Sequence, residues 1–281
     1  MYETRIGIGG FLYSISCEDG IRLDGSLDPF LAPFLKGDCV MMSLRLKRVL
    51  SPPYVRVNEV IFETDSTWGL YNKRSKVLTI PPLKGGNPRI VAEFDSGFRN
   101  GMVYIYKDGE NYLLYPFLEV LTINLLSMGK GVLLHACCVD DNGKGYIFAG
   151  PSGAGKSTMA NLWKGRKGVR VLSDDRVILR GSDKGLMAYG TPWYGSANAI
   201  VADSVVVKRI FFIRHAKENK ATPIKGVRSI LELVTSSFLP FWDRDGVEYS
   251  MRFLSQVEKE GNLFCMGFLP EDGVVDLVRG L

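Results

Sequence analysis

The sequence predicts an α/β protein with a β-rich N-terminal region, residues 1–112, and a second domain, residues 113–281. Two observations lead to this prediction. Short apolar or alternating runs, separated by proline and glycine pairs, fill the first region and are typical of strands joined by turns. From Pro116 onward, a helical apolar run is followed by strand-like runs, a glycine-rich loop and another helix. Strand, loop, helix and strand in that order favour a sheet covered by helices.

The composition allows a substantial hydrophobic core. Of 281 residues, 46% are hydrophobic and 23% are charged, which is ordinary for a globular protein. The net charge of +5 is small and spread along the chain, so it calls for no nucleic-acid partner, although it suits an anionic ligand. The start lacks a signal-peptide layout, and no apolar run approaches the ~20 residues that cross a bilayer. We expect a soluble, cytoplasmic protein without a membrane partner. The sequence leaves open whether the protein forms a homo-oligomer.

The five cysteines form no C-x-x-C pair and predict neither a zinc site nor a disulfide framework. They are Cys17, Cys39, Cys137, Cys138 and Cys265. Cys137 and Cys138 lie in an apolar run, where we expect buried small side chains.

In the N-terminal region, we expect strands at residues 40–44 and 77–80. A turn at residues 107–110 predicts a hairpin between residues 103–106 and 112–115. No residue of this region carries recognisable chemistry.

The second domain is expected to alternate helices and strands. The expected elements are a helix at 117–128 that ends at Gly129, strands at 132–139 and 145–149, a helix at 156–164 and a strand at 169–172.

The motif G-x-x-x-x-G-K-[ST] follows the strand at 145–149 and precedes a helix. Its residues are Gly150, Pro151, Ser152, Gly153, Ala154, Gly155, Lys156, Ser157 and Thr158. The glycines allow successive backbone N–H groups to point into one cavity that fits phosphate oxygens. The helix N-terminus adds its positive dipole. Lys156 is placed to reach the outer phosphates, and the Ser157 hydroxyl to bind Mg²⁺. The motif therefore predicts a site for ATP with Mg²⁺.

Two carboxylates are expected beside this loop. Asp174 and Asp175 come shortly after the strand expected at 169–172. Asp174 follows Lys156 by eighteen residues (174 − 156). A phosphoryl-transfer site needs a metal ligand and a base, and two adjacent carboxylates could divide those roles. His135 precedes Lys156 by twenty-one residues (156 − 135) in a neighbouring strand. Spacing alone leaves open whether His135 is functional or a hydrogen-bonded core residue.

The order Leu134-His135, Val139-Asp140, the glycine-rich motif and Asp174-Asp175-Arg176-Val177 resembles the catalytic core of HPr kinase/phosphorylase. That family shares its core with phosphoenolpyruvate carboxykinases. The resemblance implies a P-loop kinase domain over the second half of the chain. It also implies that Lys156 and Ser157 hold phosphates and Mg²⁺ and that His135 lies in the active site. One of Asp174 and Asp175 would be the general base, with Asp174 preferred, and Asp175 would join Ser157 as a metal ligand.

The chain departs from that family in two places. Thr158 stands where HPr kinases usually carry glutamate, and Gly190-Thr191-Pro192-Trp193-Tyr194-Gly195 replaces a later glutamate-containing segment. The chain after Val205 instead resembles HPr-kinase-like proteins, some of which modify peptides. The implied acceptor is a serine of a peptide or protein other than HPr. The segment 190–195 either lines the acceptor or forms a buried aromatic turn.

Two alternatives stay open from the sequence. One is a nucleotide-binding regulatory protein that transfers no phosphate. The joint presence of Lys156, Ser157, Asp174 and His135 argues against it, because nucleotide binding alone needs no general base. The other is a small-molecule or carboxykinase-like enzyme, against which the chain shows no convergent set of arginines suited to a dicarboxylate.

Overall fold

The computed structural model describes residues 2–18, 20–32 and 39–281. They form a mixed α/β protein with two large mixed sheets and few helices, as the sequence predicts at this level. The chain divides into two compact units, Met1–Leu125 and Leu126–Leu281. This division lies after the boundary expected at residues 112 and 113. The intervening segment packs on the first sheet, where the Thr122 and Tyr13 hydroxyls lie 2.9 Å apart and the Phe117 ring stacks on Phe94.

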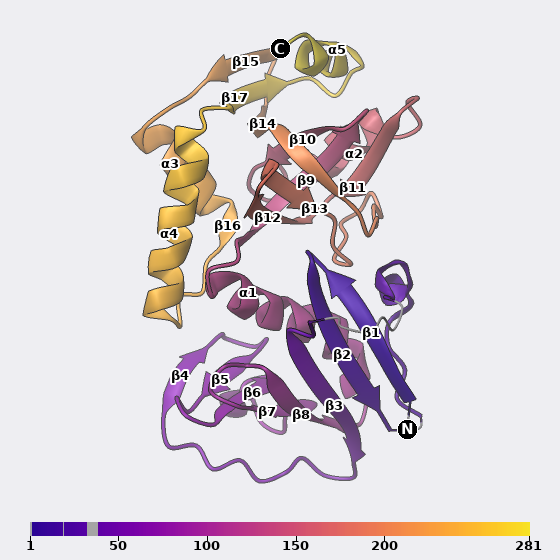
Figure 1. The fold of residues 1–281 in the computed structure, drawn as a ribbon, viewed down its shortest axis with the longest axis vertical. Helices are drawn as coiled ribbons and strands as arrows, with labels where there is room; N and C mark the ends of the chain where they lie inside the picture. Colours follow the sequence, from indigo (N-terminus) through magenta and orange to yellow (C-terminus); the bar gives the residue numbers. More distant parts are fainter. Residues whose placement is uncertain (1, 19, 33–38) are drawn as a thin grey trace. The chain divides into compact units, whose positions relative to one another are not determined.

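The first unit is built on an eight-stranded sheet of order β1-β2-β3-β8-β7-β6-β5-β4 (Figure 1). Its strands are β1 (Tyr2–Ile8), β2 (Phe11–Cys17), β3 (Met42–Val49), β4 (Val60–Glu63), β5 (Gly69–Tyr71), β6 (Lys76–Ile80), β7 (Ile90–Phe94) and β8 (Asn100–Tyr106). The pairs β2–β3 and β3–β8 are parallel and the others antiparallel. In β2 every second side chain is buried, from Phe11 to Cys17, so one face of this strand carries core.

Helical turns complete the first unit. They are three 3-10 turns, η1 (Gly25–Phe30), η2 (Leu83–Gly85) and η3 (Gly109–Tyr112), and a wide turn, η4 (Leu113–Leu118). The helix α1 (Glu119–Ser127) follows, and the division between the units falls within it, after Leu125. The strand predicted at residues 77–80 is confirmed in β6, and the one predicted at 40–44 begins at Met42. The predicted hairpin is wrong, because residues 112–115 belong to η3 and η4 instead of pairing with β8. Leu113 and Pro116 are buried there, so burial outweighs the strand propensity of the tyrosines.

The second unit is built on a nine-stranded sheet with the path β10-β9-β12-β13-β14-β17-β15. Strands β11 and β16 also pair with β9, and β10 pairs with β14. The strands are β9 (Val132–Asp141), β10 (Lys144–Ala149), β11 (Val169–Ser173), β12 (Arg176–Ser182), β13 (Gly185–Tyr189), β14 (Ser204–His215), β15 (Lys220–Pro223), β16 (Ser237–Phe238) and β17 (Leu263–Phe268). The helices are α2 (Lys156–Trp163), α3 (Val227–Thr235), α4 (Arg244–Lys259) and α5 (Gly273–Gly280). The predicted order of strand, loop, helix and strand is confirmed in β10, α2 and β11.

The central strands of this sheet are buried on both faces. Cys137 and Cys138 are fully buried, as predicted, and belong to two different core clusters. The first cluster contains Leu134 and Ile147, and the second contains Trp163 of α2. Core side chains therefore support β9 and β10 from both faces of the sheet.

Strand directions decide where the loops of the second unit meet. Strand β10 runs parallel to β14, and β14 runs parallel to β17. Their carboxyl ends therefore lie at one edge, where open α/β sheets bind ligands. Strand β9 is antiparallel to β10, β11 and β12. None of the helices in the described ranges is both long and apolar enough to cross a bilayer.

Candidate functional site

The glycine-rich segment 150–155 joins β10 to α2 at the edge formed by the carboxyl ends of the parallel strands. Gly153 and Gly155 have φ angles of 80° and 100°, which other residues adopt only with strain. Helix α2 begins directly at Lys156, so its first backbone N–H groups have no partner within the helix. The segment therefore leads into a helix N-terminus whose first N–H groups face the end of the turn, a common environment for anions.

A pocket of about 400 Å³ opens over this segment. Its lining combines the glycine-rich turn, a residue of β9, the residues that follow β11, the end of β14 and the segment after Tyr194. The lining residues are His135, Ser152, Gly153, Gly155, Lys156, Ser157, Thr158, Asp174, Asp175, Gly195, Ser196 and His215. All four residues predicted to be catalytic lie here. Of the predicted binding residues, Gly150, Pro151 and Ala154 lie behind this lining in the same turn.

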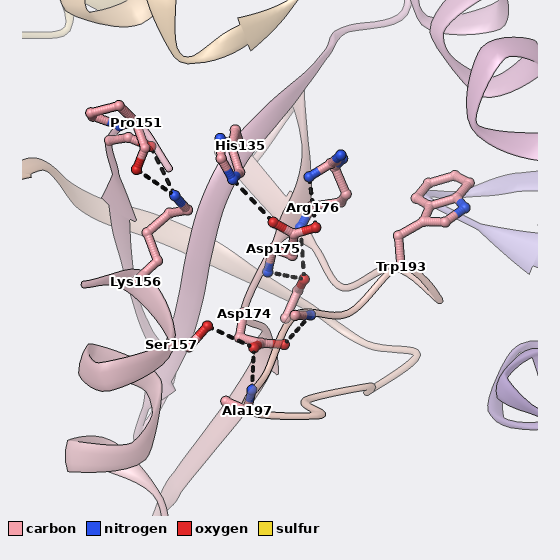
Figure 2. A network of polar contacts seen from close by, with 12 residues as sticks. His135, Pro151, Lys156, Ser157, Asp174, Asp175, Arg176, Trp193 and Ala197 are labelled. Atoms are coloured by element: carbon pink, nitrogen blue, oxygen red, sulfur yellow. Dashed lines mark hydrogen bonds and ion pairs between the residues drawn. The ribbon is translucent and has the colours of Figure 1, made fainter. Parts of the chain in front are cut away.

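Lys156 is turned back onto its own loop. Its Nζ donates to the carbonyl oxygens of Gly150 and Pro151, at 2.9 Å each, and Figure 2 shows the side chain directed toward Pro151. Burial lowers the pKa of Lys156, although the negative charge of Asp175 opposes this shift. The ammonium group thus rests on neutral acceptors at the side of the pocket.

Asp174 is a buried carboxylate with four hydrogen-bond donors around it. It accepts from Ser157 Oγ at 3.2 Å and from the backbone N–H group of Ala197 at 2.7 Å (Figure 2). It also accepts from the backbone N–H groups of Gly195 and Ala199 at 3.0 and 3.2 Å. Asp174 is only 1% exposed. Both oxygens are therefore occupied, and the carboxylate fixes the hydroxyl of Ser157 in place.

Gly195 allows this arrangement because it has no side chain. A Cβ atom at this position would lie 2.9 Å from Asp174 Oδ2 and 3.3 Å from Ser157 Oγ. The two neighbouring aromatic residues differ, since Trp193 is 5% exposed and Tyr194 is 46% exposed. The segment 190–195 thus combines a buried aromatic side chain, an exposed one and direct support of Asp174.

Asp175 has a different environment. Its Oδ1 accepts from His135 Nε2 at 3.1 Å, and its Oδ2 accepts from Arg176 Nη1 at 2.6 Å (Figure 2). Burial acts to raise the pKa of Asp175, but the hydrogen bond from His135 and the charges of Arg176 and Lys156 outweigh it and hold the pKa below its usual value. The Arg176 guanidinium lies 4.3 Å over the Phe238 ring. Asp175 is thus an ionised, oriented carboxylate that keeps partial access to the pocket.

The structure shows which contacts His135 makes. Strand β9 places it beside the glycine-rich segment, as expected, and its ring contacts Asp175 instead of being enclosed in the core. Its register partner across the sheet is Arg176. His135 and Arg176 therefore hold Asp175 between them.

Sequence reasoning missed His215 and Ser196. His215 ends β14, its Nε2 lies within hydrogen-bond distance of the Gly153 carbonyl oxygen (2.9 Å), and its ring stacks on Phe268 at 5.8 Å. The rule that ligand sites lie at the carboxyl ends of parallel strands could have indicated His215, because the apolar run of β14 is visible in the sequence. Ser196 had no such signal, because it lies in an irregular segment.

A scan of protein-family models finds none that matches this chain, and a search of curated proteins finds no match either.

The two adjacent aspartates are expected to differ in their contribution to stability. Asp174→Asn places an amide N–H group against buried backbone donors, so it should lower the free energy of unfolding by about 2 kcal/mol or more. Asp175→Asn, the matched control, loses partly exposed charge pairs and should cost about 1 kcal/mol or less. Urea unfolding of both variants measures the difference. Equal losses would show that the hydrogen bonds to Asp174 are not the distinguishing feature.

Proposed function

We propose that the second unit is an Mg²⁺-dependent kinase that transfers the γ-phosphoryl group of ATP to a hydroxyl group. One observation carries the proposal. A lysine, a hydroxyl and two carboxylates in unlike environments line one pocket over a glycine-rich turn. Phosphoryl transfer requires charge stabilisation for the phosphates together with a group that can take the acceptor's proton. A site for nucleotide binding alone would need no ionised carboxylate such as Asp175.

The phosphate half of the site consists of the turn, Lys156 and Ser157. The backbone N–H groups and the lysine cation suit the negative charge of a triphosphate. For Mg²⁺, the Ser157 hydroxyl would supply an oxygen ligand of the kind that this ion prefers. The described residues contain no cluster of three or more His, Cys, Asp or Glu side chains that could hold a metal alone. This donor set fits an ion that takes its remaining ligands from phosphates and water. Mg²⁺ would then partly neutralise the negative charge of the phosphates.

We assign the base to Asp175 and the support of Ser157 to Asp174, the reverse of the preference drawn from the sequence. Asp174 has its oxygens occupied by four donors. Asp175 is ionised, reaches the pocket and is oriented by His135 and Arg176. In the reaction, the acceptor hydroxyl gives its proton to Asp175 as its oxygen bonds to the γ-phosphorus. The bond from that phosphorus to the bridging oxygen breaks, and ADP leaves.

The resemblance to HPr kinase/phosphorylase is part of the same proposal. It rests on His135, the glycine-rich motif and the aspartate pair, which lie around one pocket here. We propose a P-loop kinase domain of that type, with the core it shares with phosphoenolpyruvate carboxykinases. The acceptor we propose is a serine of a peptide or protein. The exposed Tyr194 beside Gly195 supports this choice, because an aromatic surface at the rim of a site suits an extended chain.

Removing the Lys156 cation should abolish most of the transfer. Lys156→Ala is expected to lower turnover at least about a thousandfold, because the cation stabilises charge on the migrating phosphoryl group. The matched control is Lys167→Ala, since Lys167 is also a lysine near α2 but is exposed. A single-turnover assay with labelled ATP measures both variants. Full turnover in a folded Lys156→Ala protein would exclude the proposed chemistry.

The assignment of the base predicts opposite behaviour for the two aspartates. Asp175→Asn cannot take a proton, so transfer should fall about a hundredfold or more while ATP affinity changes little. Asp174→Asn should weaken binding of the Mg²⁺–nucleotide complex, because Ser157 loses its orienting acceptor. Calorimetric titration and the transfer assay separate these effects. Active Asp175→Asn beside inactive Asp174→Asn of normal affinity would restore the assignment preferred from the sequence.

The acceptor is tested with the same labelled ATP. Serine-containing peptides should be labelled at least about tenfold faster than free serine and common hydroxy metabolites, because an extended chain gains contacts beyond the reacting hydroxyl. Mass spectrometry of the product locates the phosphoryl group. Efficient labelling of a free metabolite alone would support the small-molecule alternative. Tight ATP binding without labelling of any acceptor would support the regulatory one.

A further inference from the structure

A second pocket adjoins the candidate site along the edge of the sheet. Its volume is about 320 Å³, and we call it the β14 pocket. Its lining residues are Arg214, His215, Ala216, Glu218, Lys220, Thr222, Arg228, Cys265, Met266 and Gly267. His215 lines both pockets. A ligand longer than the first pocket can therefore continue into the second past a single side chain.

The strand order places the β14 pocket opposite the reacting end of the site. Strand β10 and its glycine-rich turn lie between β9, which carries His135, and β14, which carries His215. Asp175 lies beyond β9, at the end of β11, which pairs with it. A linear triphosphate that lies on the turn with its last phosphate at Asp175 therefore has its other end directed toward β14.

The β14 pocket offers one imidazole ring and several side-chain donors to a ligand with acceptor atoms. The exposed ring of His215 lines the side that it shares with the first pocket, and the buried ring of Phe268 stacks behind it. Arg214 is paired with Glu232, whereas Lys220 and Arg228 have no carboxylate partner within the described ranges. Arg228 Nη2 instead lies 3.2 Å from Cys265 Sγ. Guanidinium groups stack on aromatic faces and donate to ring nitrogens and hydroxyls, which are the features of a nucleoside.

We propose that the β14 pocket binds the nucleoside half of the nucleotide, with Arg228 as a donor to the base or ribose. This proposal rests on the proposed function, because it requires a triphosphate on the glycine-rich turn. It goes further in naming a subsite and residues that neither the motif nor the aspartate pair indicates. It also gives a role to His215, whose side chain lies between the glycine-rich turn and the β14 pocket.

Cys265 provides a reporter inside the β14 pocket. It is partly exposed there, whereas Cys17, Cys137 and Cys138 are buried and Cys39 is exposed. In a Cys39→Ser protein, iodoacetamide should therefore react mainly with Cys265. ATP with Mg²⁺ at about ten times its Kd should slow this alkylation roughly tenfold, because only the free protein reacts. Tripolyphosphate with Mg²⁺, which lacks the nucleoside, should slow it less than about twofold at the same multiple of its Kd.

A variant tests the residue itself. Arg228→Gln should weaken ATP binding about tenfold and leave tripolyphosphate binding unchanged, because one charge-assisted hydrogen bond is lost. The matched control is Arg252→Gln, an exposed arginine on α4 that pairs with Glu248. Calorimetric titration of both ligands measures each variant.

The outcomes separate this proposal from the proposed function. ATP binding that depends on Lys156 but leaves Cys265 unprotected overturns the nucleoside subsite alone. Equal protection by ATP and tripolyphosphate, or protection by an acidic peptide without ATP, also overturns it. Absence of any ATP binding overturns both proposals. Selective protection by ATP together with the selective loss in Arg228→Gln supports the subsite.

Discussion

The candidate site depends on one buried carboxylate. Asp174 joins three segments that are distant in sequence: the end of β11, the first turn of α2 through Ser157, and the loop at Gly195 and Ala197. A buried charge is costly unless it is hydrogen-bonded, and here the backbone donors of one loop satisfy it. That loop is positioned by the same bonds. The resulting geometry fixes Ser157 and leaves the neighbouring Asp175 turned toward His135.

The sheet gives the site a direction. Antiparallel β9 brings His135 and its partner Asp175 to one side of the glycine-rich turn, and parallel β14 brings His215 to the other. The two histidines of the chain thus flank the turn from opposite strands. One holds a carboxylate with access to the pocket, and the other contacts the turn's backbone and an aromatic ring. An elongated anion would meet chemically different surroundings at its two ends.

Local sequence patterns predicted most strands and helices around the candidate site, but not the different environments of Asp174 and Asp175. The strand before the motif, α2 and the aspartate pair follow from short apolar runs and turn residues. The difference between Asp174 and Asp175 does not, because the backbone donors of Asp174 lie twenty-one to twenty-five residues further along an irregular loop. The second strand of the hairpin expected between residues 103–106 and 112–115 failed for a related reason. Burial of Leu113 and Pro116 outweighed the preference of the tyrosines for strand.

Lys156 is the residue of the candidate site whose contacts a bound phosphate would change. Its ammonium group now rests on the carbonyl oxygens of Gly150 and Pro151, and burial lowers its pKa. A phosphate entering the pocket would offer charged oxygens, to which hydrogen bonds are about twice as strong as to neutral ones. The exchange requires only side-chain rotation, because Lys156 is already fixed as the first residue of α2. Phosphate binding of this kind would leave the backbone of α2 in place and confine much of its conformational cost to one flexible side chain.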